Sequence, residues 1–499
     1  MKISNKKNNT HRPAKNMFLR AYDYRMVFSF TLLLMSPGGS FAAEGKNDFE
    51  WSVDKTELPQ TTAERTYGTD AKGLDPDKLE PSDSPMTTPP VVETTKEERL
   101  RWRGIVTYNP PTSDTLSGDD GLRQYLAAHD IGYVGQWLVQ GGYNFADHAH
   151  TGPDGRQGYF GQKLTYLTGP QINFIFDLSR YGLDAQIVAG ATVTKTNWDS
   201  AGPDQAGLAV LTYYQTLLDK RVEVKAGFMA NNYEFYGPFV GGNIASSIFG
   251  SSGGIPQQAG LSSIAFPRPG ANVKLNFGEF FYDKFGVQRS SSPDGYVQQH
   301  ADDSFGMKWD IPNAGTLYIN ELGYMRPAGP KQSQLWLRAG YIRNDSEFQN
   351  FRDGGRSNEN EAGYVLGDGQ LTQLDPAMPH RGLYGGFSAY RADPRYGAIS
   401  STYELRLYGM GLSAKRPQDV VSFIVSRNEF SHDLINRQQD AGLRTHDNST
   451  NYTLAYNAKV TRGVVAGIGL TYSARPNPII YDDDTGRSLT LLSNLIFFF

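Results

Sequence analysis

The chain ends on the stretch LTLLSNLIFFF, residues 489–499, and this stretch decides the fold. Alternate residues of a β-strand lie on opposite faces, and one face here carries Leu489, Leu491, Leu495, Phe497 and Phe499. In a soluble protein, a strand that ends on three phenylalanines would be an aggregation-prone edge. The last strand of a membrane barrel avoids this, because its backbone pairs with the first strand and its aromatics face lipid. The C-terminal stretch therefore predicts a closed barrel.

The same two-residue alternation recurs upstream, from residue 131 onward, between polar and Gly-rich loops. It is found in 172–178, 222–228, 304–311, 451–459 and 464–472. A soluble β-sandwich would also alternate. However, loops such as 344–379 are long and hydrophilic while others are short, which is typical of the external loops and periplasmic turns of an outer-membrane barrel. At about 20–25 residues per strand and loop, the part after 130 predicts about 16 strands.

The 499-residue chain begins with a basic region followed by the apolar stretch MVFSFTLLLM at 26–35 and the small-x-small site Ser40-Phe41-Ala42. This pattern predicts a signal peptide over 1–42, cleaved after Ala42. The apolar stretch is too short for a spanning helix, which needs roughly 20 residues. The mean hydropathy of −0.48 fits a barrel wall, whose lipid-facing and lumen-facing residues alternate.

Residues 43–115 are rich in Pro, Thr, Asp, Glu and Lys, as in KGLDPDKLEPSDSPMTTPPVVETTKEERLR at 72–101. Such a composition buries little apolar surface, so it predicts a flexible periplasmic leader. The leader could act as a tether or have no function of its own, and the composition favours the second interpretation. A short helix is expected at 119–130, capped by Ser117 or an Asp. We therefore expect an all-β chain: a disordered leader, a short helix, and a transmembrane antiparallel β-barrel over 116–499.

Several weak motifs occur in a characteristic order. They are GLRQYL at 121–126 with DIG at 130–132, RVEVKAG at 221–227, FPRPG at 266–270, GLYG at 382–385, RPQDVV at 416–421 and ARPNP at 474–478. Over about 115–499 the chain thereby resembles the carbohydrate-selective porin family, the OprB type. The resemblance implies a 16-stranded outer-membrane barrel that passes monosaccharides or polyols, with glucose the familiar substrate. The sequence has Gln418-Asp419 where that family usually has two aspartates.

A sugar pore needs polar groups that exchange hydrogen bonds with hydroxyls, and binding weak enough to permit release. Polar residues on the predicted strands are the candidates for the lumen: Asp177, Asp184, Glu223, Lys225, Lys308, Arg338, Glu404 and Arg406. The Gly-rich loop 231–254 could fold back and narrow the barrel, and its candidates are Asn231, Asn232, Tyr233 and Phe235. The simpler interpretation is that these are ordinary wall and loop residues.

Other functions have weaker support. His148 and His150, beside Asp147 and Asp154, could bind a metal, but an accidental pair in a surface loop is the simpler account. The run 482–484, three aspartates, could bridge a divalent cation to lipopolysaccharide, or simply be a polar hairpin loop. A barrel enzyme would need a Ser/His/acid trio at the outer rim, and no spacing favours one. No cofactor, metal or catalytic residue is expected.

The alternative within the pore class is a general or anion-preferring porin, which would need an excess of lumen Lys and Arg. The candidate lumen residues include both positive and negative charges, which favours a pore for neutral solutes. The expected partners are small sugars, outer-membrane lipid and lipopolysaccharide, and the barrel assembly machinery, which would recognise the C-terminal Phe499. The net charge of −4 does not favour nucleic acid as a partner. A homo-oligomer remains open.

Overall fold

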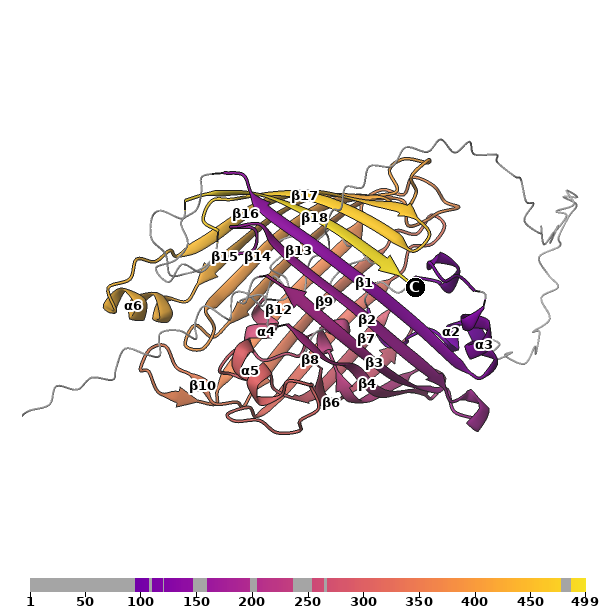
Figure 1. The fold of residues 1–499 in the computed structure, drawn as a ribbon, viewed down its shortest axis with the longest axis horizontal. Helices are drawn as coiled ribbons and strands as arrows, with labels where there is room; N and C mark the ends of the chain where they lie inside the picture. The colour runs from indigo at the N-terminus through magenta and orange to yellow at the C-terminus, as the bar shows by residue number, and fades with distance from the viewer. Residues whose placement is uncertain are drawn as a thin grey trace, which may run out of the picture. The chain divides into compact units, whose positions relative to one another are not determined.

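The computed structural model describes residues 95–106, 110–119, 121–146, 159–197, 204–236, 254–263, 267–476 and 486–499. Within these residues, sixteen strands close into one antiparallel barrel (Figure 1). The strands are β1 (Ile131–Asn144), β2 (Thr165–Asp177), β3 (Ala185–Thr196), β4 (Gln205–Leu217), β5 (Val222–Met229), β6 (Arg268–Phe277), β7 (Phe281–Arg289), β8 (Thr316–Arg326), β9 (Leu335–Asn344), β12 (Asn360–Gln370), β13 (Gly382–Ala392), β14 (Ile399–Met410), β15 (Val420–Phe430), β16 (Asn448–Thr461), β17 (Val464–Ser473) and β18 (Ser488–Phe498). A separate hairpin joins β10 (Phe348–Gln349) and β11 (Arg356–Ser357). The predicted barrel and its strand number are confirmed.

The barrel closes where the sequence predicts, between the first and the last strand. β18 pairs with β1 in a register that runs from Gln136 opposite Phe498 to Asn144 opposite Thr490. The backbone of Phe499 continues this ladder, because Gly135 N donates to Phe499 O at 2.7 Å and Phe499 N donates to Gly135 O at 3.0 Å. The described barrel strands therefore leave no open edge.

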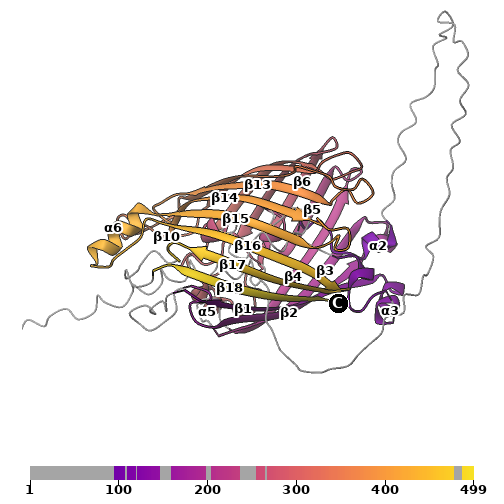
Figure 2. The ribbon, with the colours of Figure 1, turned by 90° about the horizontal axis from the view of Figure 1, so that it is seen from above.

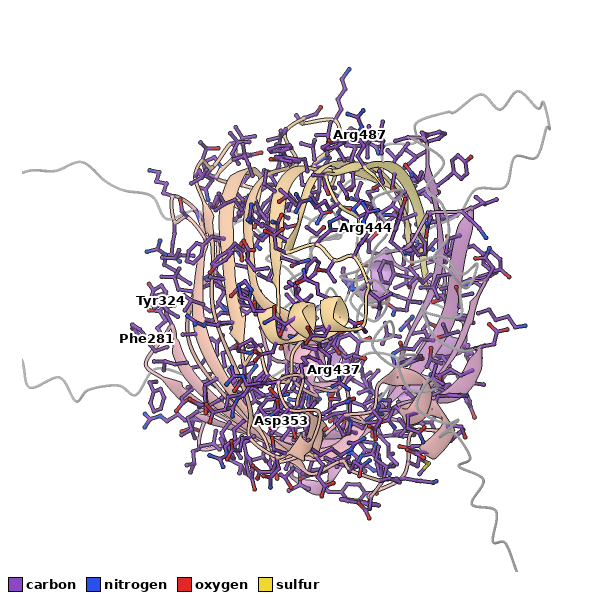
Figure 3. The ribbon with its side chains drawn as sticks, turned by 90° about the vertical axis from the view of Figure 1, so that its left-hand side faces the viewer. Phe281, Tyr324, Asp353, Arg437, Arg444 and Arg487 are labelled. Atoms are coloured by element: carbon purple, nitrogen blue, oxygen red, sulfur yellow. The ribbon has the colours of Figure 1, made fainter. Side chains whose placement is uncertain are left out.

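The two faces of the wall differ as expected for a barrel in lipid. On β14, Leu405 is 67% exposed on the outer face, whereas its neighbours Glu404 and Arg406 are buried on the inner face. Figure 3 shows Phe281 and Tyr324 on the outside of the wall, where their rings meet at 4.9 Å. Among the helices of the described residues, none is long and apolar enough to cross a bilayer. Alternation along β14 thus places the apolar residue outward and the charged residues inward.

Short helices and 3₁₀ turns lie between the described strands and before the first one. They are α2 (Lys96–Arg99), α3 (Leu122–Ala128), α4 (Gly254–Gln258), α5 (Tyr296–Asp302) and α6 (His432–Asp440), with the 3₁₀ turns η2 (Thr112–Asp114), η3 (Ser179–Tyr181) and η5 (Asn231–Tyr233). α2 and α3 lie at the end that holds the C-terminus, and α6 lies at the opposite end (Figure 2). α3 confirms the predicted short helix. Its cap differs from the prediction: Gly121 is the N-cap without a side-chain bond, and Ser117 instead accepts a hydrogen bond from Arg123 at 3.1 Å.

The prediction that 304–311 forms a strand is wrong. After α5, one carboxylate oxygen of Asp303 accepts the backbone N–H groups of Gly306, Met307 and Lys308 at 3.0–3.1 Å, which folds this segment into a turn. Trp309 is consequently 71% exposed in the loop between β7 and β8. Alternation alone could not reveal the turn, because a capped loop can carry apolar residues at every second position by chance.

The prediction of one long loop over 344–379 is also wrong, because β12 runs through it. The stretch divides into the loop 345–359 at the end of the barrel that carries α6, the strand, and the turn 371–381 at the other end. The composition of β12 explains why the sequence did not predict this strand. Its outer face offers Val365 between the glycines Gly363 and Gly367, and its inner face carries Asp368, so the apolar signal is weak.

The end of the predicted leader is ordered in the structure, in contrast to the expectation of a flexible segment up to 115. A capping box between Thr95 and Glu98 starts α2, and Asp114 pairs with Lys459 of β16 at 2.5 Å. Residues 95–106, here called the lumen segment, pack against the inner wall through Trp102. The predicted signal peptide, 1–42, lies outside the described residues.

Candidate functional site

The loop between β5 and β6 enters the barrel. Its first part, after β5, meets β8 and β9: Tyr236 N donates to Glu321 Oε2 at 2.8 Å, and Arg338 Nε donates to Tyr236 O at 2.9 Å. Further along the loop, α4 packs on β12, β13 and β14, and Gln258 hydrogen bonds to the backbone of Ile399 on β14. β14 is separated from β6 by β7, β8, β9, β12 and β13. The described parts of the loop, 231–236 and 254–263, therefore lie against the inner wall, and whether the loop narrows the pore remains a prediction.

The loop brings its own apolar core into the barrel. Phe235 and Ile255 pack in one cluster with the inward-facing Leu317 and Ile319 of β8 and Ile342 of β9. The inner faces of β8 and β9 therefore carry apolar as well as polar residues. Inward apolar residues are stable there because the loop, and not water, covers them.

Glu321 on β8 is the acceptor that fixes the loop to the wall. It is fully buried and accepts hydrogen bonds from Tyr282 Oη at 2.9 Å and Tyr364 Oη at 2.7 Å, in addition to Tyr236 N. Three donors satisfy a carboxylate that would otherwise be costly to bury. Glu321 was not among the residues predicted to line the lumen, although it lies two residues after Ile319 and therefore on the same, inner face.

An ion-pair cluster lies on the inner face of β9, β12 and β14. Arg406 donates to both oxygens of Asp368 at 3.0 Å and to Glu404 Oε1 at 2.6 Å. Arg338 Nη2 lies 3.7 Å from Asp368 Oδ2, and its guanidinium stacks 3.5 Å above the ring of Trp336. The side chains of all four charged residues are at most 7% exposed. The cluster is therefore a rigid, charge-balanced group of ion pairs on the inner face of the wall.

One glycine makes this cluster possible. Gly386 on β13 stands between Asp368 on β12 and Arg406 on β14 in the strand register. A Cβ atom at 386 would come within 2.3 Å of Asp368 Oδ1 and 3.0 Å of the Arg406 guanidinium. Only a residue without a side chain lets the two charges meet across β13.

A second charged group lies on β5, β6 and β7. Lys225 pairs with Glu234 at 2.8 Å, and Lys274 pairs with Glu223 at 2.6 Å. Lys284 on β7 donates to the backbone carbonyl of Glu234. The inner wall thus carries alternating charges from the root of the loop toward the end that holds the C-terminus.

The structure brings together many of the predicted lumen residues but separates others. Arg338, Glu404 and Arg406 share one cluster, while Glu223 and Lys225 belong to the other. Asp177 pairs with Arg99 at 3.1 Å, and Asp184 pairs with Arg103 at 2.5 Å. Both carboxylates therefore hold the lumen segment. Lys308 lies in the turn described above and not on a strand.

The four predicted loop residues lie at the root of the loop. Asn231 is fully buried and hydrogen bonds to Gln288 at 2.8 Å and to Asn272 at 2.7 Å, so it anchors the loop to β6 and β7. Phe235 lies in the apolar cluster. Tyr233 packs on Trp102, and Asn232 is buried beside it. The side chains of Asn231, Tyr233 and Phe235 hold the loop in place, and whether any of the four residues contacts a solute remains a prediction.

The residues missed by sequence reasoning are those whose partners lie on other strands. They are Glu234, Lys284, Glu321, Trp336 and Asp368. The possible metal ligands, His148 with His150 and the aspartates of 482–484, lie outside the described residues. Within the described ranges, no group of three or more His, Cys, Asp or Glu side chains could hold a metal ion.

A closed sixteen-strand barrel with an apolar outer face, a charged lumen and an infolded loop defines an outer-membrane porin. The model of the "Carbohydrate-selective porin, OprB family" matches residues 180–483. The chain belongs to this family and is a bacterial outer-membrane protein.

Among solved structures, the high-pH form of an OprB supports the barrel fold. The chain is similar to the high-pH structure of Pseudomonas putida OprB, with a TM-score of 0.65 and 16% identity over 77% of this chain and 98% of that chain. The low-pH structure of the same protein matches with a TM-score of 0.48 and 15% identity, over 78% and 99% of the two chains. An anion-selective porin from Comamonas acidovorans matches with a TM-score of 0.42 and 10% identity, over 74% and 99%. No curated protein matches the sequence.

Proposed function

We propose that this porin lets small neutral carbohydrates (glucose, other monosaccharides and polyols) diffuse passively into the periplasm past the cluster of Arg338, Asp368, Glu404 and Arg406. The observation that carries the proposal is charge balance. Two guanidinium groups face two carboxylates in this cluster, and an excess of one sign would be needed to select ions.

The second charged group also contains ion pairs. Glu223 pairs with Lys274 and Glu234 pairs with Lys225, while Lys284 donates to the backbone carbonyl of Glu234. The anion-preferring alternative would require uncompensated cations along this wall. A neutral solute that carries many hydroxyls fits a wall of alternating donors and acceptors better.

Transport by such a wall follows from hydrogen-bond exchange. A sugar hydroxyl can accept a hydrogen bond from a guanidinium and donate one to a carboxylate. These bonds replace those to water, so the free-energy cost of removing the sugar from its hydration shell is small. Because each charged group already has a charged partner, the wall does not bind the sugar tightly. Weak binding at several positions permits release into the periplasm.

The remaining predictions concern the outside of the barrel. The apolar outer face would contact lipid and lipopolysaccharide, and Phe499 would be the residue that the barrel assembly machinery recognises. A signal peptide over 1–42 would direct export. A homo-oligomer remains a prediction, as does the absence of an enzymatic activity.

The test is a liposome-swelling assay on the refolded mature chain with glucose, a polyol, a disaccharide and a charged amino acid. Faster swelling with glucose and the polyol than with the amino acid is expected. Substitution of Arg338, Arg406 or Asn232 by Ala should then change the glucose rate. No swelling with any solute would exclude passive diffusion, and faster swelling with an anionic amino acid would favour the anion-preferring porin.

A further inference from the structure

The lumen segment, 95–106, covers an apolar patch on the inner wall. Trp102 packs against the inward-facing Ile175 of β2, Val188 of β3 and Val210 of β4. Its ring also meets the ring of Tyr233 at 5.3 Å, edge to face. Without this segment these apolar side chains would face the water of the lumen, so their burial holds the segment inside the barrel.

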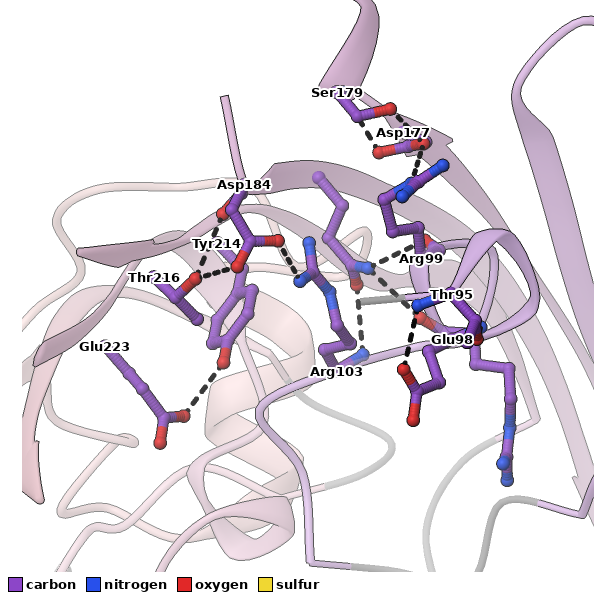
Figure 4. Close-up of polar contacts among 12 residues, drawn as sticks. Thr95, Glu98, Arg99, Arg103, Asp177, Ser179, Asp184, Tyr214, Thr216 and Glu223 are labelled. Carbon is purple, nitrogen blue, oxygen red and sulfur yellow. Dashed lines mark hydrogen bonds and ion pairs between the residues drawn. The ribbon is translucent and has the colours of Figure 1, made fainter. Parts of the chain in front are cut away.

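Polar contacts fix the register of the lumen segment on the wall (Figure 4). Arg103 N donates to Gln186 Oε1 at 3.0 Å, and Gln186 Nε2 donates back to Arg101 O at 3.0 Å, as in an added strand edge. Arg103 reaches Asp184 in the turn before β3, and Arg99 reaches Asp177 at the end of β2. The segment is thus held by backbone and side-chain bonds at several positions.

The C-terminal end of the lumen segment is hydrogen bonded to the root of the infolded loop and to β5. Val106 N donates to Tyr233 O at 2.7 Å, and Lys225 Nζ donates to Gly104 O at 2.7 Å. Gly104 has a φ of +70°, and a Cβ atom there would come within 2.6 Å of the Tyr214 ring. The segment and the loop therefore form one continuous inner structure.

Open space in this part of the barrel lies between the lumen segment and the strands. One cavity of about 470 Å³ is bounded by Glu98, Arg101 and Arg103 on one side and by β4–β6 residues on the other. A second cavity, of about 210 Å³, is bounded by 104–106 and by residues of β4–β7. Ile105, Tyr214 and Glu223 line both cavities.

We propose that residues 101–106 form one wall of the carbohydrate path between the infolded loop and the end of the barrel that holds the C-terminus. The size of sugar that passes would then be set by this part of the leader together with the barrel strands. This inference rests on the proposed function. The site would take a small neutral polyhydroxylated solute, since Glu223, Lys274 and Asn276 offer hydrogen-bond partners opposite the segment.

The test uses the absence of cysteine from the chain. In the full-length protein, Ile105→Cys introduces a single thiol beside both cavities. Tyr181→Cys, in the exposed turn η3, is the matched control, because its side chain lines neither cavity. The thiols are reacted with N-ethylmaleimide, which adds bulk without charge, and glucose swelling is measured before and after.

We expect labelling at position 105 to reduce the glucose rate several-fold and labelling at 181 to leave it unchanged. If the thiol at 105 is labelled without effect, or cannot be labelled from water, the inference is wrong while the proposed function stands. If the unlabelled proteins and the wild type all fail to pass glucose, the proposed function itself is wrong.

A second variant tests the size limit. Trp102→Ala removes the side chain that holds the lumen segment on the wall, and Trp102→Phe retains an aromatic ring. The ratio of disaccharide to glucose swelling should rise in the first variant and stay near the wild-type value in the second. An unchanged ratio in Trp102→Ala, in a protein that still passes glucose, would overturn the inference.

Discussion

The aromatic ring of Phe499, the last residue of the chain, lies directly over Gly135 of the first strand. The two residues exchange both backbone hydrogen bonds, and a Cβ atom at 135 would come within 2.1 Å of the Phe499 ring. The C-terminal ring therefore occupies the space that a side chain at 135 would need. The pairing of β1 with β18, which closes the barrel, depends on this fit.

Gly135→Val should impair barrel closure, because the branched side chain and the Phe499 ring cannot occupy the same space. We expect a smaller folded fraction, measured as the fraction of protein that shows heat-dependent migration on a denaturing gel. Gly369→Ala is the matched control, since a Cβ atom there makes only ordinary contacts, the nearest at 3.4 Å from Leu335. Equal folded fractions for the two variants would contradict the prediction.

Arg406→Met should make the pore cation-selective. The substitution leaves Asp368 and Glu404 without their main cation, and breaking a buried ion pair typically costs about 3–5 kcal/mol. The measurement is the reversal potential across a planar bilayer that separates two salt concentrations. Arg427→Met removes the same charge from an exposed position on β15 and should leave the reversal potential unchanged. A shift of equal size in both variants would count against a role for the cluster.

Glu321→Ala should release the infolded loop from the wall. Tyr236 N and the hydroxyls of Tyr282 and Tyr364 would lose their acceptor, at about 1–3 kcal/mol for each donor left unsatisfied. Single-channel recordings should show larger fluctuations in current, because the loop can then leave its position on the inner wall. Glu361→Ala, on the exposed face of β12, is the control. A steady wild-type current in Glu321→Ala would show that other contacts suffice.

Asp419, in the turn before β15, should make stability depend on pH. Burial alone would raise the pKa of its carboxyl, but hydrogen bonds from Arg416, Tyr456 and the Lys459 N–H outweigh burial and lower the pKa. Because the pKa is lowered, the charged carboxylate stabilises the fold fully at pH values above the ordinary pKa of an aspartate, about 3.9. This stabilisation is lost as the pH falls through the lowered pKa.

Asp419→Asn should therefore be less stable than the wild type at neutral pH, and the difference should narrow in acid. The measurement is the denaturation midpoint of both proteins in detergent at several pH values. A difference that stays constant from neutral to acidic pH would show that the charge of Asp419 is not responsible.

The sequence by itself determined the barrel. Strict alternation in stretches such as 451–459 and 464–472, and the aromatic series that ends at Phe499, require one lipid-facing side, because only a closed barrel satisfies the backbone of such strands in a membrane. The same periodicity placed Arg338, Glu404 and Arg406 on the inner face. The prediction was wrong in two places. The glycines and polar residues of β12 weakened the alternation of a real strand, and the loop 304–311 alternates although it is not a strand.

Only the tertiary structure decided which inner residues meet. Arg406 reaches Asp368 because Gly386 leaves room between them, and Glu321 holds Tyr236 because the chain folds inward after β5 and reaches β8. The ordering of 95–106 depends likewise on the apolar patch of Ile175, Val188 and Val210 inside the closed barrel. These contacts join residues far apart in the chain. Their existence depends on strand register and closure, which local periodicity does not encode.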